Sequence, residues 1–184
     1  MDPTQVEAIA MRQIDPGERL LWSGTPAPGE AASAALPGTF IGIPFTGFAA
    51  FWIWSAWSMM PQAAGPWRFF PLFGVPFALI GLGVMLAPIW AALRARNTVY
   101  AVTERRAMII FNGGGGGITS YGRADMAEVS RAERADGSGS VFFATRTSTT
   151  SRGFVKHTRV GFLGIPDVRN VERLIREHIV ERAA

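Results

Sequence analysis

Two long apolar runs, separated by a short link, dominate the first half of the chain. Residues 36–60 and 69–93 contain no charged side chain, and residues 61–68 connect them. A helix of about 25 residues reaches roughly 37 Å, which exceeds the roughly 30 Å hydrocarbon core of a bilayer. The pattern therefore predicts two transmembrane helices that form a hairpin, with a bend at Pro76 in the second helix.

Arginine placement predicts how this hairpin is oriented. Arg94, Arg96, Arg105 and Arg106 follow the second run, whereas the link has only Arg68. Cytoplasmic flanks are enriched in Lys and Arg, so we expect the part after the second run to be cytoplasmic. A hairpin then places residues 1–35 on the same side and the link outside. This makes a multi-pass protein of the plasma (inner) membrane with both termini cytoplasmic.

Overall composition agrees with a membrane location and excludes several kinds of chemistry. Charged residues make up 17% of the chain, against about 25% in average soluble proteins. The chain has no cysteine, which excludes disulfides, thiolate catalysis, Cys-based zinc sites and iron–sulfur clusters.

The pattern changes after residue 97 to short β-type runs separated by turn residues. The predicted strands cover residues 98–102, 107–111, 118–121, 128–133, 140–145 and 158–162, with a polar loop over 146–153. Val168, Val171, Leu174, Ile175 and Ile179 then recur at helical spacing, which predicts a final amphipathic helix capped by Asp167. An antiparallel meander followed by one helix predicts an α+β domain over residues 97–184.

Three sequence motifs carry a resemblance to a known family. They are GERLLWSG at 17–24, YAVTERRAMII at 100–110 and GFLGIPDV at 161–168. In this order around a hairpin, they resemble membrane-anchored bacterial pleckstrin-homology (PH)-like proteins, whose PH-type domain follows a transmembrane hairpin. The resemblance implies a small split β-barrel closed by the carboxyl-terminal helix, and an interaction or scaffold role. The five glycines at 113–117 and the Ser/Thr-rich loop depart from many relatives.

Basic side chains are the best candidates for binding. The selected residues are Arg94, Arg96, Arg105, Arg106, Arg152, Lys156 and Arg159. Beside an anionic leaflet, each Lys or Arg contributes about 1 kcal/mol of attraction. The cations around the Ser/Thr-rich loop, Arg152, Lys156 and Arg159, would also suit a phosphorylated headgroup or an acidic partner. The alternative is that they only set topology and solvate the surface. Nucleic acid is not expected, because aromatic side chains for base stacking are not interleaved with these cations.

Small residues in the apolar runs are candidates for helix packing. Gly38 and Gly42 form a small-xxx-small pair in the first run, and Gly81 and Gly83 lie in the second.

Catalytic motifs are not recognisable in the chain. The glycine run is followed by Ile118-Thr-Ser rather than by the Lys-Ser/Thr of a phosphate-binding loop. His157 and His178 are the only histidines, and structural roles suit both better than a metal site. We therefore expect a non-enzymatic membrane protein without metal or cofactor. It would present a PH-like domain to membrane lipids or to a protein partner, with homo-oligomerisation a further option. The alternative function is an accessory subunit of a transport or envelope-assembly complex, recognised through its helices.

Overall fold

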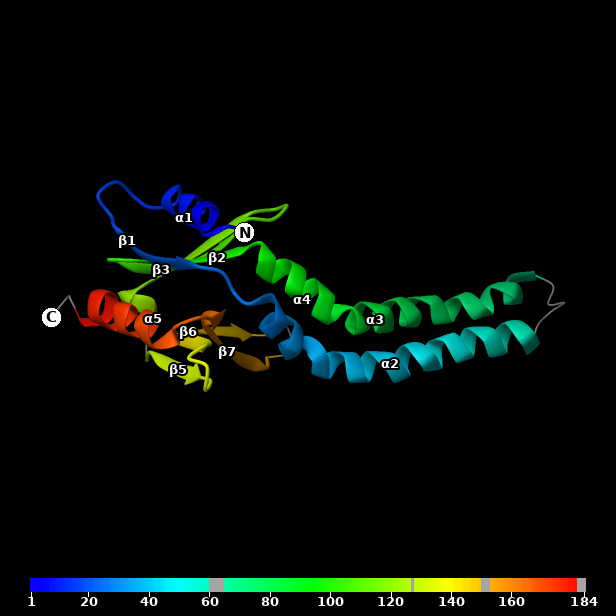
Figure 1. The fold of residues 1–184 in the computed structure, drawn as a ribbon. Helices are drawn as coiled ribbons and strands as arrows, with labels where there is room; N and C mark the ends of the chain where they lie inside the picture. Colours follow the sequence, from blue (N-terminus) through cyan, green and yellow to red (C-terminus); the bar gives the residue numbers. More distant parts are fainter. Residues whose placement is uncertain (60–64, 127, 150–152, 182–184) are drawn as a thin grey trace. The chain divides into compact units, whose positions relative to one another are not determined.

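The computed structural model describes residues 1–59, 65–126, 128–149 and 153–181. The chain divides into two compact units, and each is described by itself (Figure 1). Unit 1 combines Met1–Glu30 with Leu93–Ala184, and unit 2 is Ala31–Ala92.

Unit 2 is built from apolar helices. The long helix α2 (Pro28–Met59) contains Pro37 and Pro44, and it starts before the predicted residue 36 because residues 28–35 are rich in the helix former alanine. The second run comprises a 3₁₀ segment, η1 (Gly65–Gly74), and the helices α3 (Val75–Met85) and α4 (Ala87–Arg96). Of the helices in the described residues, α2 alone is long and apolar enough to cross a membrane. Phe69–Met85 and Ala87–Arg96 meet that criterion only as a pair, bent by 49°.

The bend in the second run lies at Leu86, not at the predicted Pro76. Pro76 occupies the first turn of α3, where a missing backbone N–H costs no helical hydrogen bond. Pro88 lies two residues after Leu86 and cannot donate a backbone hydrogen bond to the preceding turn. The break therefore falls between α3 and α4, just ahead of this proline.

Unit 1 contains two antiparallel sheets. One has the order β1-β2-β3-β4 and the other β5-β6-β7. The strands are β1 (Leu20–Gly24), β2 (Thr98–Thr103), β3 (Arg106–Phe111), β4 (Gly117–Gly122), β5 (Ser130–Glu133), β6 (Gly139–Thr149) and β7 (Val155–Ile165). The helical elements are α1 (Pro3–Met11), the 3₁₀ turn η2 (Arg123–Asp125) and α5 (Val168–Ile175), which continues as a π-helix, η3 (Arg176–Glu181).

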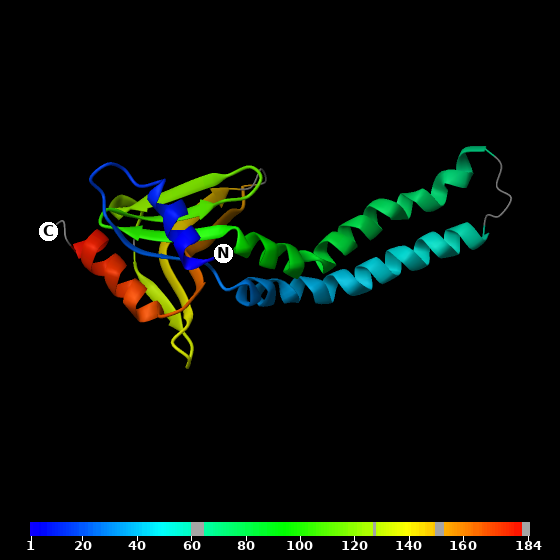
Figure 2. The same cartoon turned by 45° about the horizontal axis from the view of Figure 1, so that its top comes forward.

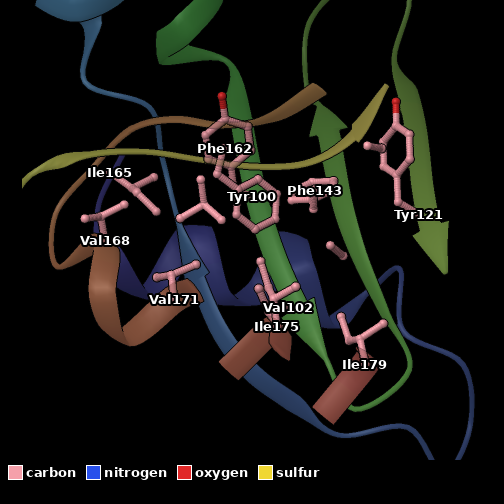
Figure 3. Close-up of a cluster of buried hydrophobic side chains, with 13 residues drawn as sticks. Tyr100, Val102, Tyr121, Phe143, Phe162, Ile165, Val168, Val171, Ile175 and Ile179 are labelled. Atoms are coloured by element: carbon pink, nitrogen blue, oxygen red, sulfur yellow. The ribbon is translucent and has the colours of Figure 1, made fainter. Parts of the chain in front are cut away.

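The main core of unit 1 lies between the sheets and the carboxyl-terminal helix. Tyr100 stacks on Phe162 at a centroid distance of 4.6 Å, and Phe143 meets Phe162 edge-on at 5.0 Å. The helix side chains Val171 and Ile175 are fully buried and point toward β2 (Figure 3). The apolar stripe predicted for this helix is therefore confirmed as a core face.

A second, smaller core covers the opposite face of the four-stranded sheet. Because side chains alternate along a strand, Val99 and Ala101 point away from the main core. They pack with Met108 against Val6 and Ala10 of α1, which crosses these strands in Figure 2. The middle of β2 is buried on both faces as a result.

The amino-terminal segment belongs to this domain, which corrects the predicted division into 1–35 and 97–184. In the β1–β2 register, Trp22 lies opposite Val102, Ser23 opposite Ala101 and Gly24 opposite Tyr100. A five-residue edge strand has little periodicity of its own, and its partner lies more than 70 residues later in the chain. The sequence pattern therefore did not reveal the pairing.

The six predicted strands all coincide with observed ones, but two further predictions are wrong. The stretch 146–153 is not a loop throughout, because β6 continues to Thr149 and β7 begins at Val155. Alternating threonines suit an extended backbone, which accounts for the longer β6. Asp167 makes no capping hydrogen bond and adopts a left-handed conformation with φ 51°, which Asp tolerates better than most residues.

Candidate functional site

The outer half of the β6–β7 hairpin is an exposed ribbon, here called the arm. It comprises Thr145–Thr149 of β6 and Val155–Arg159 of β7, and every one of these side chains is exposed (Figure 1, yellow and brown). The two strands stay in regular register, from Thr145 opposite Arg159 to Thr149 opposite Val155. Hydrogen bonding between the strands therefore holds the arm in place without burial of its side chains.

The charge of the arm is uniformly positive. Residues 137–166 contain no Asp or Glu, while the described strands of the arm carry Arg146, Lys156 and Arg159. Among the residues that the structure describes, none of these three cations forms an ion pair. The predicted contact residue Arg152 lies outside the described residues.

The strand register sorts the arm's polar side chains onto two faces. Residues directly opposite each other in an antiparallel pair share a face. Arg146 lies opposite Thr158, and Ser148 lies opposite Lys156, so these four residues form the first face. The second face carries Thr147 opposite His157 and Thr145 opposite Arg159, with Thr149 opposite Val155.

Some of the arm's polar side chains contact neighbouring side chains. On the first face, Arg146 Nη2 donates a hydrogen bond to the Tyr121 hydroxyl at 3.2 Å. On the second face, the guanidinium of Arg159 lies 5.5 Å from the centroid of the Phe142 ring, and Thr147 Oγ1 lies 3.1 Å from His157 Nδ1. The first face keeps most of its polar donors directed to solvent.

An apolar pair lies where the second strand of the arm begins. Phe154 is 72% exposed and Val155 is 56% exposed, where β7 begins. Sequence reasoning missed this pair because both residues fall between the predicted strands 140–145 and 158–162. The alternation of Thr145, Thr147 and Thr149 with Arg146 and Ser148 was the available signal for a longer ribbon.

Arg106, predicted as a lipid or partner contact, is instead bound within unit 1. Its Nη2 lies 2.7 Å from Asp15 Oδ2 and 2.9 Å from Glu18 Oε2. Glu18 also accepts a 2.5 Å hydrogen bond from Thr103 Oγ1. Burial by itself raises the pKa of Glu18, but the hydrogen bonds from Thr103 and Arg106 outweigh burial and lower this pKa below its ordinary value. The ion pairs tie the segment before β1 to the turn between β2 and β3.

The other three arginines near the second apolar run do not form one cluster. Arg94, Arg96 and Arg105 are exposed, and the guanidinium of Arg94 lies 5.1 Å from the centroid of the Phe111 ring. Arg105 lies in the β2–β3 turn, and the six residues of β2 separate it from Arg96. A strand of that length spans about 20 Å, so closeness in sequence does not bring these cations together.

The four candidate packing glycines have different surroundings within unit 2. A Cβ on Gly42 would lie 2.8 Å from the backbone N of Met85, and one on Gly81 would overlap Thr46 Oγ1. Gly38 leaves ordinary space beside Val84, at 3.6 Å, and Gly83 has no neighbour within 4 Å. The structure thus brings Gly42 and Gly81 together in a close contact between α2 and α3.

A metal centre is not found in the described parts of the chain, where no three His, Asp or Glu side chains come together. His178 Nδ1 lies 3.3 Å from the Leu174 carbonyl, in the last turns of the carboxyl-terminal helix. Comparison of the chain with protein-family models, with curated proteins and with solved structures finds no match.

Proposed function

We propose that this protein is a non-enzymatic membrane anchor for an interaction domain. Unit 2 crosses the plasma membrane as a two-helix hairpin, and unit 1 is a PH-like domain at the cytoplasmic surface. The observation that carries the proposal is the pairing of β1 with β2 across the whole of unit 2.

This pairing supports an even number of membrane crossings. Strand β1 precedes the apolar segment and β2 follows it, yet the two are hydrogen-bonded neighbours in one sheet. A single crossing would place them on opposite sides of the bilayer, where they could not pair. Two crossings, by α2 and by the bent pair α3–α4, keep both strands on one side. The arginines that follow the second run favour the cytoplasm as that side.

The strand arrangement supports the PH-like assignment. A four-stranded and a three-stranded antiparallel sheet, followed by one helix packed on the core, have the composition of the split barrel that the sequence resemblance implies. In this proposal the hairpin is an insertion between the first two strands of that barrel, so the PH-like domain takes in residues 1–30 as well as 97–184. Anchoring confines the domain to one leaflet and raises its effective concentration for partners there.

The alternative role, as an accessory subunit recognised through its helices, has weaker support. Of its four candidate contacts, Gly42 and Gly81 face each other inside unit 2.

Single-cysteine labelling tests the proposed topology cleanly, because the natural chain has no cysteine. We would introduce Gln13→Cys before β1, Ala135→Cys between β5 and β6, and Gln62→Cys in the predicted link. A membrane-impermeant maleimide added to intact spheroplasts should label only the Gln62→Cys variant, and lysis should expose the other two. Labelling of Gln13→Cys and Ala135→Cys on opposite sides, or release of the protein by alkaline carbonate, would refute the proposal.

A further inference from the structure

We propose that the arm docks on anionic phospholipids of the same membrane that holds unit 2. The first face of the arm would bind headgroup phosphates, and Phe154, which directly precedes β7, would enter the apolar–polar boundary. This inference rests on the proposed membrane anchoring and assigns the arm as the lipid-contacting surface of unit 1.

The first face is a compact set of donors. Arg146, Thr158, Ser148 and Lys156 occupy two successive cross-strand pairs on the same side of the ribbon. Opposite residues in such pairs lie about 5 Å apart, and diagonal ones about 7–8 Å, so one phosphate group can bridge the guanidinium and the ammonium group. The hydroxyls of Ser148 and Thr158 lie in the same block and can donate to the remaining oxygens. Arg146 is already oriented by its hydrogen bond to Tyr121.

The arm differs from the other basic surface of unit 1 in lacking counter-charges. Around α5, Arg131 and Arg176 pair with Glu172, while Arg169 pairs with Glu133. In the described part of the arm, by contrast, the cations have no carboxylate partner, and the nearest acidic residues in the sequence are Asp136 and Asp167. An anionic surface therefore gains attraction to the arm without first breaking an ion pair.

The apolar pair favours a lipid surface as the occupant over a soluble anion. Phe154 and Val155 are exposed within two residues of Lys156. Val155 lies opposite Thr149 on the second face, so Phe154 is the apolar group that we assign to this contact. Interfacial segments use this combination, in which apolar side chains enter the headgroup boundary and cations remain with the phosphates. A soluble phosphate would use only the cations and hydroxyls.

The test uses the full-length chain carrying Thr149→Cys, labelled with an environment-sensitive fluorophore. Thr149 is opposite Val155 and exposed, so the probe reports on the apolar end of the arm while Phe154 stays in place. The protein is reconstituted in vesicles of phosphatidylcholine alone or mixed with phosphatidylglycerol. We expect a blue shift and quenching by brominated lipid in the anionic vesicles, with both effects reduced at high salt.

Matched substitutions distinguish binding through the arm from attraction by the overall positive charge of the protein. Lys156→Gln and Arg146→Gln should each lower the ratio of docked to undocked arm about fivefold, the effect of one cation near an anionic leaflet. Arg105→Gln, an exposed cation in the β2–β3 turn, should leave the ratio unchanged. Phe154→Ser should reduce the quenching by brominated lipid.

The outcomes distinguish failure of this inference from failure of the anchoring. Equal emission in neutral and anionic vesicles, or an anionic response that survives the double variant Arg146→Gln/Lys156→Gln, would overturn the docking. If Arg105→Gln reduced docking as much as Lys156→Gln or Arg146→Gln, the inference would also be overturned, because the contact would not be specific to this face. If the anchoring itself were wrong, the protein would dissociate from both kinds of vesicle under alkaline carbonate.

Discussion

Removing residues 1–30 should prevent unit 1 from folding stably, even though these residues lie on the other side of unit 2 in the sequence. Two shortened polypeptides make the comparison. The linked polypeptide joins residues 1–30 through a flexible Gly/Ser linker to residues 93–184, and the other consists of residues 93–184 alone. Because α1 and β1 contribute a helix face, an edge strand and ion pairs to unit 1, only the linked polypeptide should fold cooperatively.

The size of the effect follows from what α1 and β1 cover. Val99 and Met108 are fully buried under α1, and uncovering them costs about 1.5–3 kcal/mol each. The lost backbone hydrogen bonds between β1 and β2 add about 0.5–1.5 kcal/mol each. The two side chains alone account for about 3–6 kcal/mol. This is comparable with the whole stability of a small domain, about 5–15 kcal/mol.

Urea unfolding followed by far-ultraviolet circular dichroism measures this difference. The linked polypeptide should show a cooperative transition, and residues 93–184 alone should show a weak transition or none. The control is Gln13→Ser in the linked polypeptide, an exposed change before β1 that should leave the midpoint in place. If residues 93–184 alone unfolded at the same midpoint as the linked polypeptide, the assignment of residues 1–30 to the domain would be refuted.

Three further substitutions test other contacts. Gly81→Leu should lower the melting temperature of the full chain in detergent, because even a Cβ would overlap Thr46 Oγ1, whereas Gly83→Leu should not. Ile175→Ala should cost about 2–5 kcal/mol in the linked polypeptide, since the side chain is fully buried. In the Glu18→Gln variant, the urea midpoint should fall less steeply with decreasing pH than in the wild-type protein.

The sign of the pH effect follows from the direction of the Glu18 pKa shift. The native pKa lies below the ordinary value of 4.5, so the ionised carboxylate stabilises the fold above that pH. This contribution is lost as the pH falls from about 4.5 through the lower native pKa. A Glu18→Gln midpoint that fell with acidity as steeply as the wild-type one would contradict the argument. An unchanged melting temperature for Gly81→Leu, or an Ile175→Ala midpoint equal to wild type, would count against those contacts in the same way.

Local patterns predicted the elements whose partners are close in sequence. The β2–β3 and β5–β6 hairpins were recognisable because each strand lies within a few residues of its neighbour and turn residues separate them. The buried face of the final helix was visible because Val171 and Ile175 are four residues apart. Such features need no knowledge of the rest of the chain.

Features that depend on distant residues were not predictable from the same patterns. Strand β1 is defined by its pairing with β2, and the role of Arg106 by carboxylates at Asp15 and Glu18 more than 80 residues earlier. The candidate site was predictable as a set of cations but not as a surface. The register that places Arg146 and Lys156 on one face exists only once β6 and β7 are known to continue past residue 145.

The separation of β1 from β2 also imposes an order on synthesis. When β1 leaves the ribosome, its partner has not been made, and the 62 residues of unit 2 must follow before β2 appears. During that interval the β1 segment has no sheet to join, so the four-stranded sheet closes only after the apolar segment has been produced. The domain can therefore be completed only after unit 2 has been synthesised. A later cut between the two apolar runs would leave two pieces that are joined through a sheet rather than through the chain.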